Sequence, residues 1–468
     1  MNEPTVSISP TLAEALRELL GDRFSEAAAV RAHHSAGEGW DTPVLPGAVC
    51  FPESTEEVSA IAAACTEAGA PMVPFGAGSS LEGHVVPPAT AVSIDLTRMN
   101  AIIEVSVEDL DCHLQAGVTR EQLESDLRKQ GLFFPVDPGA DATIAGMVAT
   151  GASGTTTVRY GAMRENVLGL TVVLADGRVI HTGGRSRKSS AGYDLTRLFI
   201  ASEGTLGVIT EVQLRLRGIP EAVSAAVCQF NTVADVVNSV IEAIQIELPL
   251  ARSELVDDVQ MRAFIEHEGL DEFEAKPTLM LEFHGTEASV REQAEQMAEI
   301  CSSHGGADFR WATKQEERTR LWHARHRAYF AAMAMGPGKK AMVTDACVPI
   351  SRLAECIEAT RKDLEAVGLQ SPMVGHIGDG NFHCQILVDP GDDLEIATAR
   401  AFVGRLAERA IALGGTCTGE HGVGANKIDY LEKQYGAAVD VMRAIKLALD
   451  PDSLMNPGKV LRLDDSKP

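Results

Sequence analysis

The first half of the chain carries three loops of small residues, and each lies beside a short apolar run of strand length. They are Pro74–Gly83 (PFGAGSSLEG), Pro135–Thr155 and Ala201–Thr210. Small residues let a backbone approach a large flat ligand closely, and the N–H groups of a Gly/Ser loop can form a nest for a pyrophosphate. One such loop would be only a turn. Three of them indicate an extended dinucleotide cofactor.

The first loop does not fit a Rossmann nucleotide-binding turn. That turn leads directly into a helix and is followed, about twenty positions on, by an acidic residue. Here the loop continues into Val85–Pro88, whose two prolines cannot begin such a helix cleanly. We therefore expect an anion-binding loop with no helix directly behind it.

Two histidines lie symmetrically about an Asp-Gly pair in the segment Val374–His383 (VGHIGDGNFH). An Asp-Gly pair between apolar runs is typical of a two-residue hairpin turn. With Asp379 and Gly380 in the turn, we predict that His376 lies directly opposite His383. Directly opposed residues have Cβ atoms about 4.5–5.5 Å apart, which is close enough for two imidazoles to hold one divalent metal.

The later segment Thr418–Gly422 (TGEHG) offers a carboxylate and a third imidazole. Glu420 could complete a set of two nitrogens and one oxygen with open positions, which suits a catalytic metal rather than a structural zinc. His421 could then act as a base. Zinc, manganese and iron all suit this ligand set. The alternative is that these are scattered polar residues at strand ends.

Length and apolar spacing predict an α+β protein with more than one domain. A chain of 468 residues exceeds one ordinary core, and Pro220 marks the one clear boundary. The pattern predicts helices at 10–35, from 55 onward, and at 232–247, 286–304, 351–367 and 393–413. It predicts strands at 48–52, 71–75, 207–216, 223–230 and 278–284, and a hairpin at 170–180 with an Asp176-Gly177 turn.

Composition limits the partners and the compartment. A net charge of −25 argues against nucleic acid and against an anionic membrane surface, and no apolar run is long enough for a membrane span. The nine scattered cysteines fit a reducing compartment. The first ten residues lack the features of a signal or transit peptide. We expect a cytoplasmic protein, with a peripheral position at the inner membrane as a variant; a homodimer is a candidate oligomer.

The three loops, in this order, resemble the flavin domain of the vanillyl-alcohol-oxidase family of FAD-linked oxidases. The resemblance covers residues 42–463. In the second half it is similar to the flavin-dependent D-lactate dehydrogenases of the cytochrome type, with D-2-hydroxyglutarate dehydrogenase and the D subunit of glycolate oxidase as relatives. The motifs are LWHARHRA from Leu321, TDACVP from Thr344, the histidine segment, TCTGEHGVG from Thr416 and DPDSLMNPGKV from Asp450.

The resemblance implies a helical segment at 1–41, a two-lobed PCMH-type FAD-binding domain at 42–219 and an α+β cap domain at 220–468, with the tail 450–463 returning to the flavin. It implies FAD held without a covalent bond, and His84 is then an ordinary loop histidine. The implied FAD-binding residues are Pro74, Gly76, Ala77, Gly78, Ser79 and Ser80 for the pyrophosphate, and Pro138, Gly139, Thr143, Gly146, Gly151, Ser153, Gly154, Glu203, Gly204, Ile209 and Asn456 for the rest of the cofactor.

The resemblance also implies a reaction, oxidation of a D-2-hydroxy acid to the 2-oxo acid. His376, His383 and Glu420 would bind Zn²⁺ or Mn²⁺, which binds the substrate and lowers the pKa of its hydroxyl. His421 would accept the proton while hydride passes to flavin N5. The remaining assigned residues are Arg325 as a carboxylate clamp, Lys340 as a second carboxylate contact and Asn381 as an orienting group.

The identity of the substrate is a separate expectation. Tyr329 follows Arg325 by one helical turn and would shorten the pocket, which favours D-lactate over a dicarboxylate such as 2-hydroxyglutarate. The electron acceptor is left open among quinone, cytochrome c and an electron-transfer flavoprotein. The alternatives from other classes are a flavin-free metal hydrolase, a non-catalytic electron-transfer subunit and a non-haem iron oxygenase.

Overall fold

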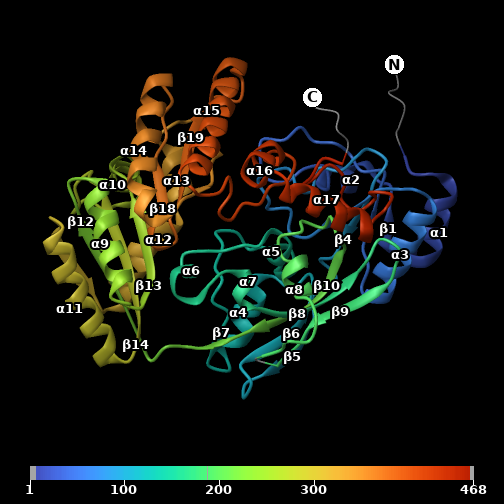
Figure 1. Cartoon of the computed structure of the whole chain (residues 1–468), viewed down its shortest axis with the longest axis horizontal. Helices are drawn as coiled ribbons and strands as arrows, with labels where there is room; N and C mark the ends of the chain where they lie inside the picture. Colours follow the sequence, from blue (N-terminus) through green and yellow to red (C-terminus); the bar gives the residue numbers. More distant parts are fainter. Residues whose placement is uncertain (1–6, 187, 464–468) are drawn as a thin grey trace. The chain divides into compact units, whose positions relative to one another are not determined.

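The computed structural model describes residues 7–186 and 188–463, and it divides into two compact units (Figure 1). The first unit comprises Met1–Ser153, Gly161–Ile219 and Glu420–Pro468, and the second comprises Gly154–Tyr160 and Pro220–Gly419. The chain therefore passes between the units several times. Residues 1–6, part of the stretch that was expected to lack a targeting peptide, lie outside the described residues.

The first unit contains a small sheet that presents the first glycine loop. Its strand order is β1 (Phe24–Ser25), β2 (Ala48–Cys50), β4 (Val92–Asp95), β3 (Met72–Phe75), and β2, β4 and β3 run parallel. Helix α3 (Thr55–Glu67) leads from β2 to β3. Ser54 caps its N-terminus, and its buried residues Val58, Ile61, Ala62 and Cys65 recur at helical spacing. The strands predicted at 48–52 and 71–75 and the helix predicted from 55 are confirmed.

The second sheet of the first unit has five antiparallel strands. Its order is β5 (Ile102–Ser106), β6 (Asp111–Gln115), β10 (Val208–Arg215), β8 (Val167–Val173), β9 (Val179–Gly183). The predicted hairpin is confirmed, because β8 and β9 pair up to Val173 and Val179, with Gly177 at φ +84° in the turn. Two further short strands pair with each other, β7 (Leu132–Phe133) and β11 (Arg217–Gly218).

Helices complete the first unit, and both sheets share one apolar core that includes Ile61, Val92 and Val212. The helices are α1 (Pro10–Leu20), α2 (Ala28–His33), α4 (Arg120–Arg128), α5 (Ile144–Thr150), α7 (Met163–Asn166), α8 (Leu195–Phe199), α16 (Ile428–Tyr435) and α17 (Ala438–Leu449), with the short 3₁₀ turn η1 (Gly21–Arg23) after α1. No helix in the described part of the chain is both long and apolar enough to cross a bilayer.

The second unit is built on one antiparallel sheet. Its order is β15 (Ala307–Ala312), β12 (Ala222–Gln229), β14 (Thr278–Gly285), β13 (Leu250–Val256), β18 (Met373–His376), β19 (Asn381–Val388), β16 (Lys340–Val343), and β17 (Ala346–Cys347) pairs with β19. All of these pairs are antiparallel. Residues 154–160 add the single turn α6 (Thr157–Tyr160), which packs on β13.

Two groups of helices cover opposite faces of this sheet. On β12, Val227 belongs to a core cluster with Trp322, whereas its neighbour Cys228 contacts Cys301 from the other side. Alternate residues of a strand point to opposite faces. The first group is α10 (Asp258–Glu268), α12 (Gln315–His326) and α13 (Ala328–Ala334). The second is α9 (Val233–Gln245), α11 (Glu287–Ser303) and α14 (Ile350–Val367), with α15 (Asp393–Ala412) against α14.

The predicted register of the histidine hairpin is wrong. His376 pairs with Asn381 rather than with His383, and the connection is a one-turn 3₁₀ helix, η2 (Ile377–Asp379), followed by Gly380 at φ +74°. The loop is therefore longer than the Asp-Gly turn alone. Because the slip moves the pairing by an even number of positions, His376 and His383 still lie on one face as diagonal neighbours, and their ring centroids are 5.4 Å apart.

The regular elements predicted after residue 220 are confirmed for β12, β14, α9, α11, α14 and α15, each within a few residues. The helix expected around Arg325 is α12, whereas the sequence pattern missed β13, α10 and α13. Strand β13 (LARSELV) is covered on both faces, and Arg252 and Glu254 interrupt the continuous apolar run by which such a strand is recognised.

Candidate flavin and metal sites

The first glycine loop has the close backbone packing that a cofactor nest requires. Gly78 has φ +72°, and a Cβ on Gly76 would stand 2.3 Å from Thr143 Oγ1. A Cβ on Gly37 would stand 2.4 Å from the Ser80 carbonyl oxygen, and Glu38 N donates to that same oxygen at 3.0 Å. Residues just before 42, which the sequence placed in a separate helical segment, therefore pack directly on the loop.

The second loop contains helix α5. Thr143 is the N-cap residue, and Gly151 closes the helix in the left-handed region at φ +67°. Gly146 lies on the first turn, where a Cβ would stand 2.9 Å from Thr143 Oγ1. Pro138 and Gly139 are at least partly exposed in the loop before it. Ser153 donates its hydroxyl to Glu420 Oε2 at 2.7 Å within the first unit.

The boundary between the two units falls between Ser153 and Gly154. Gly154 is the first residue of the segment that belongs to the second unit, and its N–H donates to Thr157 Oγ1 at 3.0 Å, which starts the single turn α6. Of the seven predicted FAD contacts in the second loop, Gly154 alone is assigned to that unit.

The third loop is held by the C-terminal tail. Glu203 (φ +54°) accepts hydrogen bonds from Val423 N and Gly424 N, both at 2.7 Å, and its carboxylate is 3.3 Å from His84 Nε2. Asn456 (φ +41°) donates from Nδ2 to the carbonyl oxygens of Glu203 at 2.7 Å and His84 at 3.0 Å. His84 is thus a buried partner of Glu203 rather than an ordinary loop residue.

Electrostatics support that buried pair. Burial alone would raise the pKa of the Glu203 carboxyl, but the charge of His84 and the two backbone donors outweigh it and the pKa is lowered. Burial opposes the charge on His84 in the same way, and the neighbouring Glu203 nonetheless raises its pKa. Gly204 (φ +72°) packs on Pro74, and Ile209 is buried in β10, so the first and third loops meet.

These features fit a bound dinucleotide. Ser80 Oγ is buried and has no hydrogen-bond partner among the described residues, so it is available to an ordered water or to a ligand. Ala77 and Ser79 complete the loop around it. No helix follows this loop within residues 76–91, as expected for an anion-binding nest rather than a Rossmann turn.

Each of the two hairpin histidines is oriented by a hydrogen bond at its Nδ1 atom. His376 Nδ1 lies 2.7 Å from Glu254 Oε1, and His383 Nδ1 lies 2.9 Å from the Thr344 carbonyl oxygen. A carboxylate and a carbonyl can only accept, so each Nδ1 carries the proton. The lone pair of each ring is then on Nε2. Such hydrogen bonds are the usual support of metal-binding histidines.

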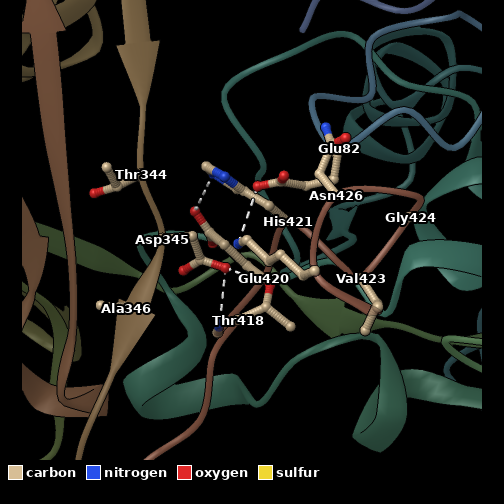
Figure 2. Close-up of polar contacts among 12 residues, drawn as sticks. Glu82, Thr344, Asp345, Ala346, Thr418, Glu420, His421, Val423, Gly424 and Asn426 are labelled. Atoms are coloured by element: carbon tan, nitrogen blue, oxygen red, sulfur yellow. Dashed lines mark hydrogen bonds and ion pairs between the residues drawn. The ribbon is translucent and has the colours of Figure 1, made fainter. Parts of the chain in front are cut away.

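Glu420 follows directly after Gly419, the last residue of the second unit, and Asp345 fixes that point. Asp345 Oδ2 accepts from Thr418 Oγ1 and Gly419 N, each at 2.7 Å, and Oδ1 accepts from Asn381 Nδ2 at 2.7 Å. Figure 2 shows Asp345 facing Thr418, with the chain continuing to Glu420. Ligand atoms of His376, His383 and Glu420 all lie within 4.8 Å of one another.

This donor set fits a divalent metal ion. Two imidazole nitrogens and one carboxylate oxygen leave coordination positions for a substrate. The predicted base, His421, is the next residue, with Nε2 3.7 Å from Glu420 Oε1 (Figure 2). The ligand set does not distinguish zinc from manganese.

Arg325 lies beside the histidines as a buried ion-pair partner rather than as a solvated helix residue. It is on α12, and its NH2 group is 2.6 Å from Glu254 Oε2. Glu254 is fully buried. Burial alone would raise the pKa of its carboxyl, but the charges and hydrogen bonds of His376 and Arg325 outweigh that effect and lower it. One carboxylate therefore contacts both a predicted metal ligand and the predicted substrate clamp.

The other predicted site residues lie at different distances from this cluster. Asn381 belongs to it, because its side chain donates to Asp345 and to the Ala346 carbonyl oxygen. Lys340 does not, because it pairs with Val388 at the opposite end of β19 from His383. Tyr329 is half exposed on α13, in edge-to-face contact with Phe330.

Sequence reasoning missed Glu254 and Asp345. Neither is part of a motif with a recognisable spacing, although Asp345 stands in the TDACVP segment. A charged residue inside an otherwise apolar strand, as at Glu254, is the signal that could have found the first, because unpaired charges are rarely buried.

Family models match most of the chain. Residues 219–460 match the model described as FAD linked oxidases, C-terminal domain, and residues 46–183 match the FAD binding domain. The chain belongs to the FAD-linked oxidases. Its fold class, an FAD-binding domain followed by an α+β oxidase domain, is thereby the one that the resemblance implied. Crystallised p-cresol methylhydroxylase has the same fold, with a TM-score of 0.82 over 98% of this chain and 99% of that one at 18% identity.

Two relatives of this FAD-linked oxidase are much more similar in sequence. A probable mitochondrial D-lactate dehydrogenase of Danio rerio is 49% identical over 96% of this chain and 91% of its own length. The mitochondrial D-lactate dehydrogenase [cytochrome] of Arabidopsis thaliana is 47% identical over 89% of this chain and 74% of its own length.

These names correct the expected location. The cytoplasmic assignment is wrong, because both relatives are named as mitochondrial proteins. A targeting segment is removed from a mature protein, so the charge and cysteine content of the folded domains carry no trace of the organelle. Composition was therefore unable to decide this point.

Proposed function

We propose that this FAD-linked oxidase is a D-lactate dehydrogenase that oxidises D-lactate to pyruvate and passes the electrons to a respiratory acceptor such as cytochrome c. The observation that carries the proposal is the sequence identity to the two mitochondrial D-lactate dehydrogenases. We further propose that residues 42–219 form the FAD domain and 220–468 the cap, a division that the matches at 46–183 and 219–460 support. Glu420–Pro468 folds with the first unit, and we propose that its tail, residues 450–463, lies at the flavin.

We propose that His376, His383 and Glu420 hold a divalent metal, zinc or manganese, and that the three glycine loops hold FAD without a covalent bond. When bound, FAD supplies a hydride acceptor and the metal supplies a Lewis acid that lowers the pKa of a coordinated hydroxyl. The support for the metal is the 4.8 Å cluster of ligand atoms and the hydrogen bonds that place both lone pairs on Nε2.

The chain's own residues would perform the binding and the proton transfer. Arg325 would bind the substrate carboxylate, because its Nε is buried without a hydrogen-bond partner among the described residues and requires an acceptor. His421 would accept the hydroxyl proton at a ring nitrogen. Asn381 would hold the approach to Glu420 through Asp345. Lys340, predicted as a second carboxylate contact, is left out of this assignment because it pairs with Val388 at the other end of β19.

Anaerobic bleaching of the purified protein tests this function. A flavoprotein is yellow, and D-lactate should reduce it, whereas L-lactate should leave the flavin oxidised. D-2-hydroxyglutarate and glycolate serve as the arms for the two related activities. Faster bleaching by either of those acids would replace D-lactate as the substrate, and a colourless protein that hydrolyses esters or amides would overturn the flavin assignment.

The acceptor requires a second measurement. The reduced protein is mixed anaerobically with oxidised cytochrome c, a soluble quinone or an electron-transfer flavoprotein, and flavin reoxidation is followed in each case. The proposal expects cytochrome c to be reduced in step with flavin reoxidation. Reoxidation by quinone alone would assign a different respiratory acceptor.

A further inference from the structure

Glu254 is a charged residue at the centre of the second unit's sheet. It is fully buried on β13, and its partner across the strand pair is His376 of β18. A buried carboxylate is retained in a fold only when charged or hydrogen-bonding groups compensate for the loss of water. The two oxygens of Glu254 have different partners, and this division suggests more than a structural ion pair.

One oxygen determines how His376 presents itself. Oε1 lies 2.7 Å from His376 Nδ1, so the ring is protonated there and offers its Nε2 lone pair on the opposite side. The carboxylate also prevents the ring from rotating out of the plane that a metal would need. The orientation of this ligand therefore depends on Glu254.

The other oxygen determines where Arg325 stands. Oε2 is 2.6 Å from Arg325 NH2. The guanidinium is planar and rigid, so fixing one nitrogen fixes the direction of its remaining N–H groups. Arg325 Nε is buried and has no hydrogen-bond partner among the described residues, so its N–H group is available to an acceptor on a ligand.

We propose that Glu254 is a positioning residue that couples metal binding to recognition of the substrate carboxylate. The inference rests on the proposed function, since it assigns roles to His376 and Arg325. Through one side chain, Glu254 sets the ring of a metal ligand and the fork of the substrate clamp. Loss of its charge should therefore weaken two kinds of binding at once, although Glu254 itself touches neither ligand.

The neighbouring strand provides a matched control. Glu282 on β14 is also buried, lies 2.7 Å from a histidine (His284 Nε2) and 3.6 Å from an arginine (Arg252 Nε), and is on the same face of the sheet. A Glu282→Gln variant removes the same charge from the same kind of cluster. It should not change metal affinity or the KM for D-lactate.

The experiment compares Glu254→Gln and Glu282→Gln as FAD-loaded proteins. Metal affinity is measured by titrating the metal-depleted protein with Mn²⁺ or with Co²⁺, whose visible spectrum reports the ligand set. We expect Glu254→Gln to lose about 10–100-fold in metal affinity. With the metal saturated, we expect its KM for D-lactate to stay raised by roughly tenfold while kcat changes less, because Arg325 remains misplaced.

The outcomes separate this inference from the proposed function. If His383→Ala loses the metal while Glu254→Gln keeps both wild-type metal affinity and wild-type KM, the coupling role is overturned and the metal site stands. If His383→Ala keeps the metal, the metal assignment itself fails. Equal losses in Glu254→Gln and Glu282→Gln would show a general packing effect and would also overturn the inference.

A second variant covers the case in which Glu254→Gln does not fold. Glu254→Asp keeps the charge but shortens the side chain, so it can reach only one of its two partners. We expect it to retain either metal affinity or substrate affinity, but not both. A folded Glu254→Asp protein with both affinities unchanged would contradict the proposal.

Discussion

Two clusters with the same chemistry lie on one face of the second unit's sheet, and they differ in what completes them. In one, Glu254 stands between His376 and Arg325; in the other, Glu282 stands between His284 and Arg252. In the first, the carboxylate accepts a hydrogen bond from the protonated Nδ1, so the lone pair of the ring is on Nε2. In the second, it accepts from the protonated Nε2, so the lone pair is on Nδ1.

The two histidines differ in the groups that lie near their unprotonated ring nitrogen. Tyr160, on the segment that the chain inserts into this unit, lies with its hydroxyl 2.7 Å from His284 Nδ1 and donates to it. Arg252 is likewise occupied, 4.8 Å from the ring centroid of Trp322. For His376, the candidate metal-binding atoms of His383 and Glu420 instead lie within 4.8 Å of its own. Whether a buried His–Glu–Arg cluster has a structural or a functional role therefore depends on which groups the fold places near the unprotonated ring nitrogen of the histidine.

The largest effect on metal binding is expected when one histidine is removed from each cluster in turn. His383→Ala should abolish tight metal binding and slow anaerobic flavin reduction by about a hundredfold or more, because a metal ion supplies several kcal/mol of charge stabilisation. His284→Ala removes the corresponding imidazole from the other cluster and should leave bound metal unchanged. Metal content by elemental analysis and stopped-flow absorbance check both variants. Equal metal content in the two would contradict the distinction.

A smaller effect is expected at the point that fixes Glu420. Asp345→Asn replaces one acceptor oxygen with an N–H group that cannot accept from Gly419 N or Thr418 Oγ1. We expect a loss of about 10–100-fold in metal affinity, the usual range for groups behind the ligands, with the flavin spectrum unchanged. Thr418→Val removes only one donor and should lose less. The order of the two variants in a metal titration is the check.

A third buried carboxylate, that of Asp257, differs from Glu254 and Glu282 in the direction of its pKa shift. The pKa values of Glu254 and Glu282 are lowered because, although burial opposes the charge, close cations outweigh it. Asp257, which follows β13 and caps α10, is different: Arg361 is 3.6 Å away, and burial raises the pKa of Asp257 to about 7. The ordinary value of an aspartate in an unfolded chain is about 3.9.

The sign of the pH effect follows from these two values. Between about pH 4 and pH 7 the folded protein binds more protons at Asp257 than the unfolded chain, so stability falls as pH rises through this window and levels off above it. Asp257→Asn should remove that slope, an effect of a few kcal/mol at most. Thermal midpoints at about pH 5 and about pH 8 check it, and an unchanged slope in the variant would exclude Asp257 as the cause.

The smallest expected effect lies in the closed cluster. Tyr160→Phe removes the hydroxyl that donates to His284 Nδ1. We expect a loss of about 1 kcal/mol in the free energy of unfolding, the usual contribution of one hydrogen bond. Metal affinity and the KM for D-lactate should stay at their wild-type values. A change in either would show that the second cluster also serves the reaction.

Much of the fold could be predicted where one physical rule acted alone. The 3.6-residue spacing of α9, α11, α14 and α15 identified those helices because each covers the sheet with one apolar face. The corresponding rule for a strand buried on both faces, a continuous apolar run, failed for β13 because Arg252 and Glu254 interrupt that run. Charge at a buried position is a signal of function and, for the same reason, an obstacle to recognising the element that carries it.

The candidate site shows the same division. The side-by-side placement of His376 and His383 was predicted with the wrong register, and it survived because an even slip keeps both residues on one face. The predicted position of Lys340 near them has no such protection, since it depends on how far along β19 the strand β16 pairs. Strand register is set by turns and packing that the local sequence does not display.

Local sequence is enough to specify the types of chemical group available: three loops that admit a dinucleotide, two histidines on one face of a hairpin, and a Glu-His pair. These follow from local rules of spacing and backbone sterics. The tertiary structure alone decided which groups support them, because Glu254, Arg325 and Asp345 come from distant strands and helices and meet only when the sheet forms. The ion pair at 2.6 Å and the hydrogen bonds of 2.7–2.9 Å between such segments, which orient the arginine and the two imidazole rings, exist only in the folded chain.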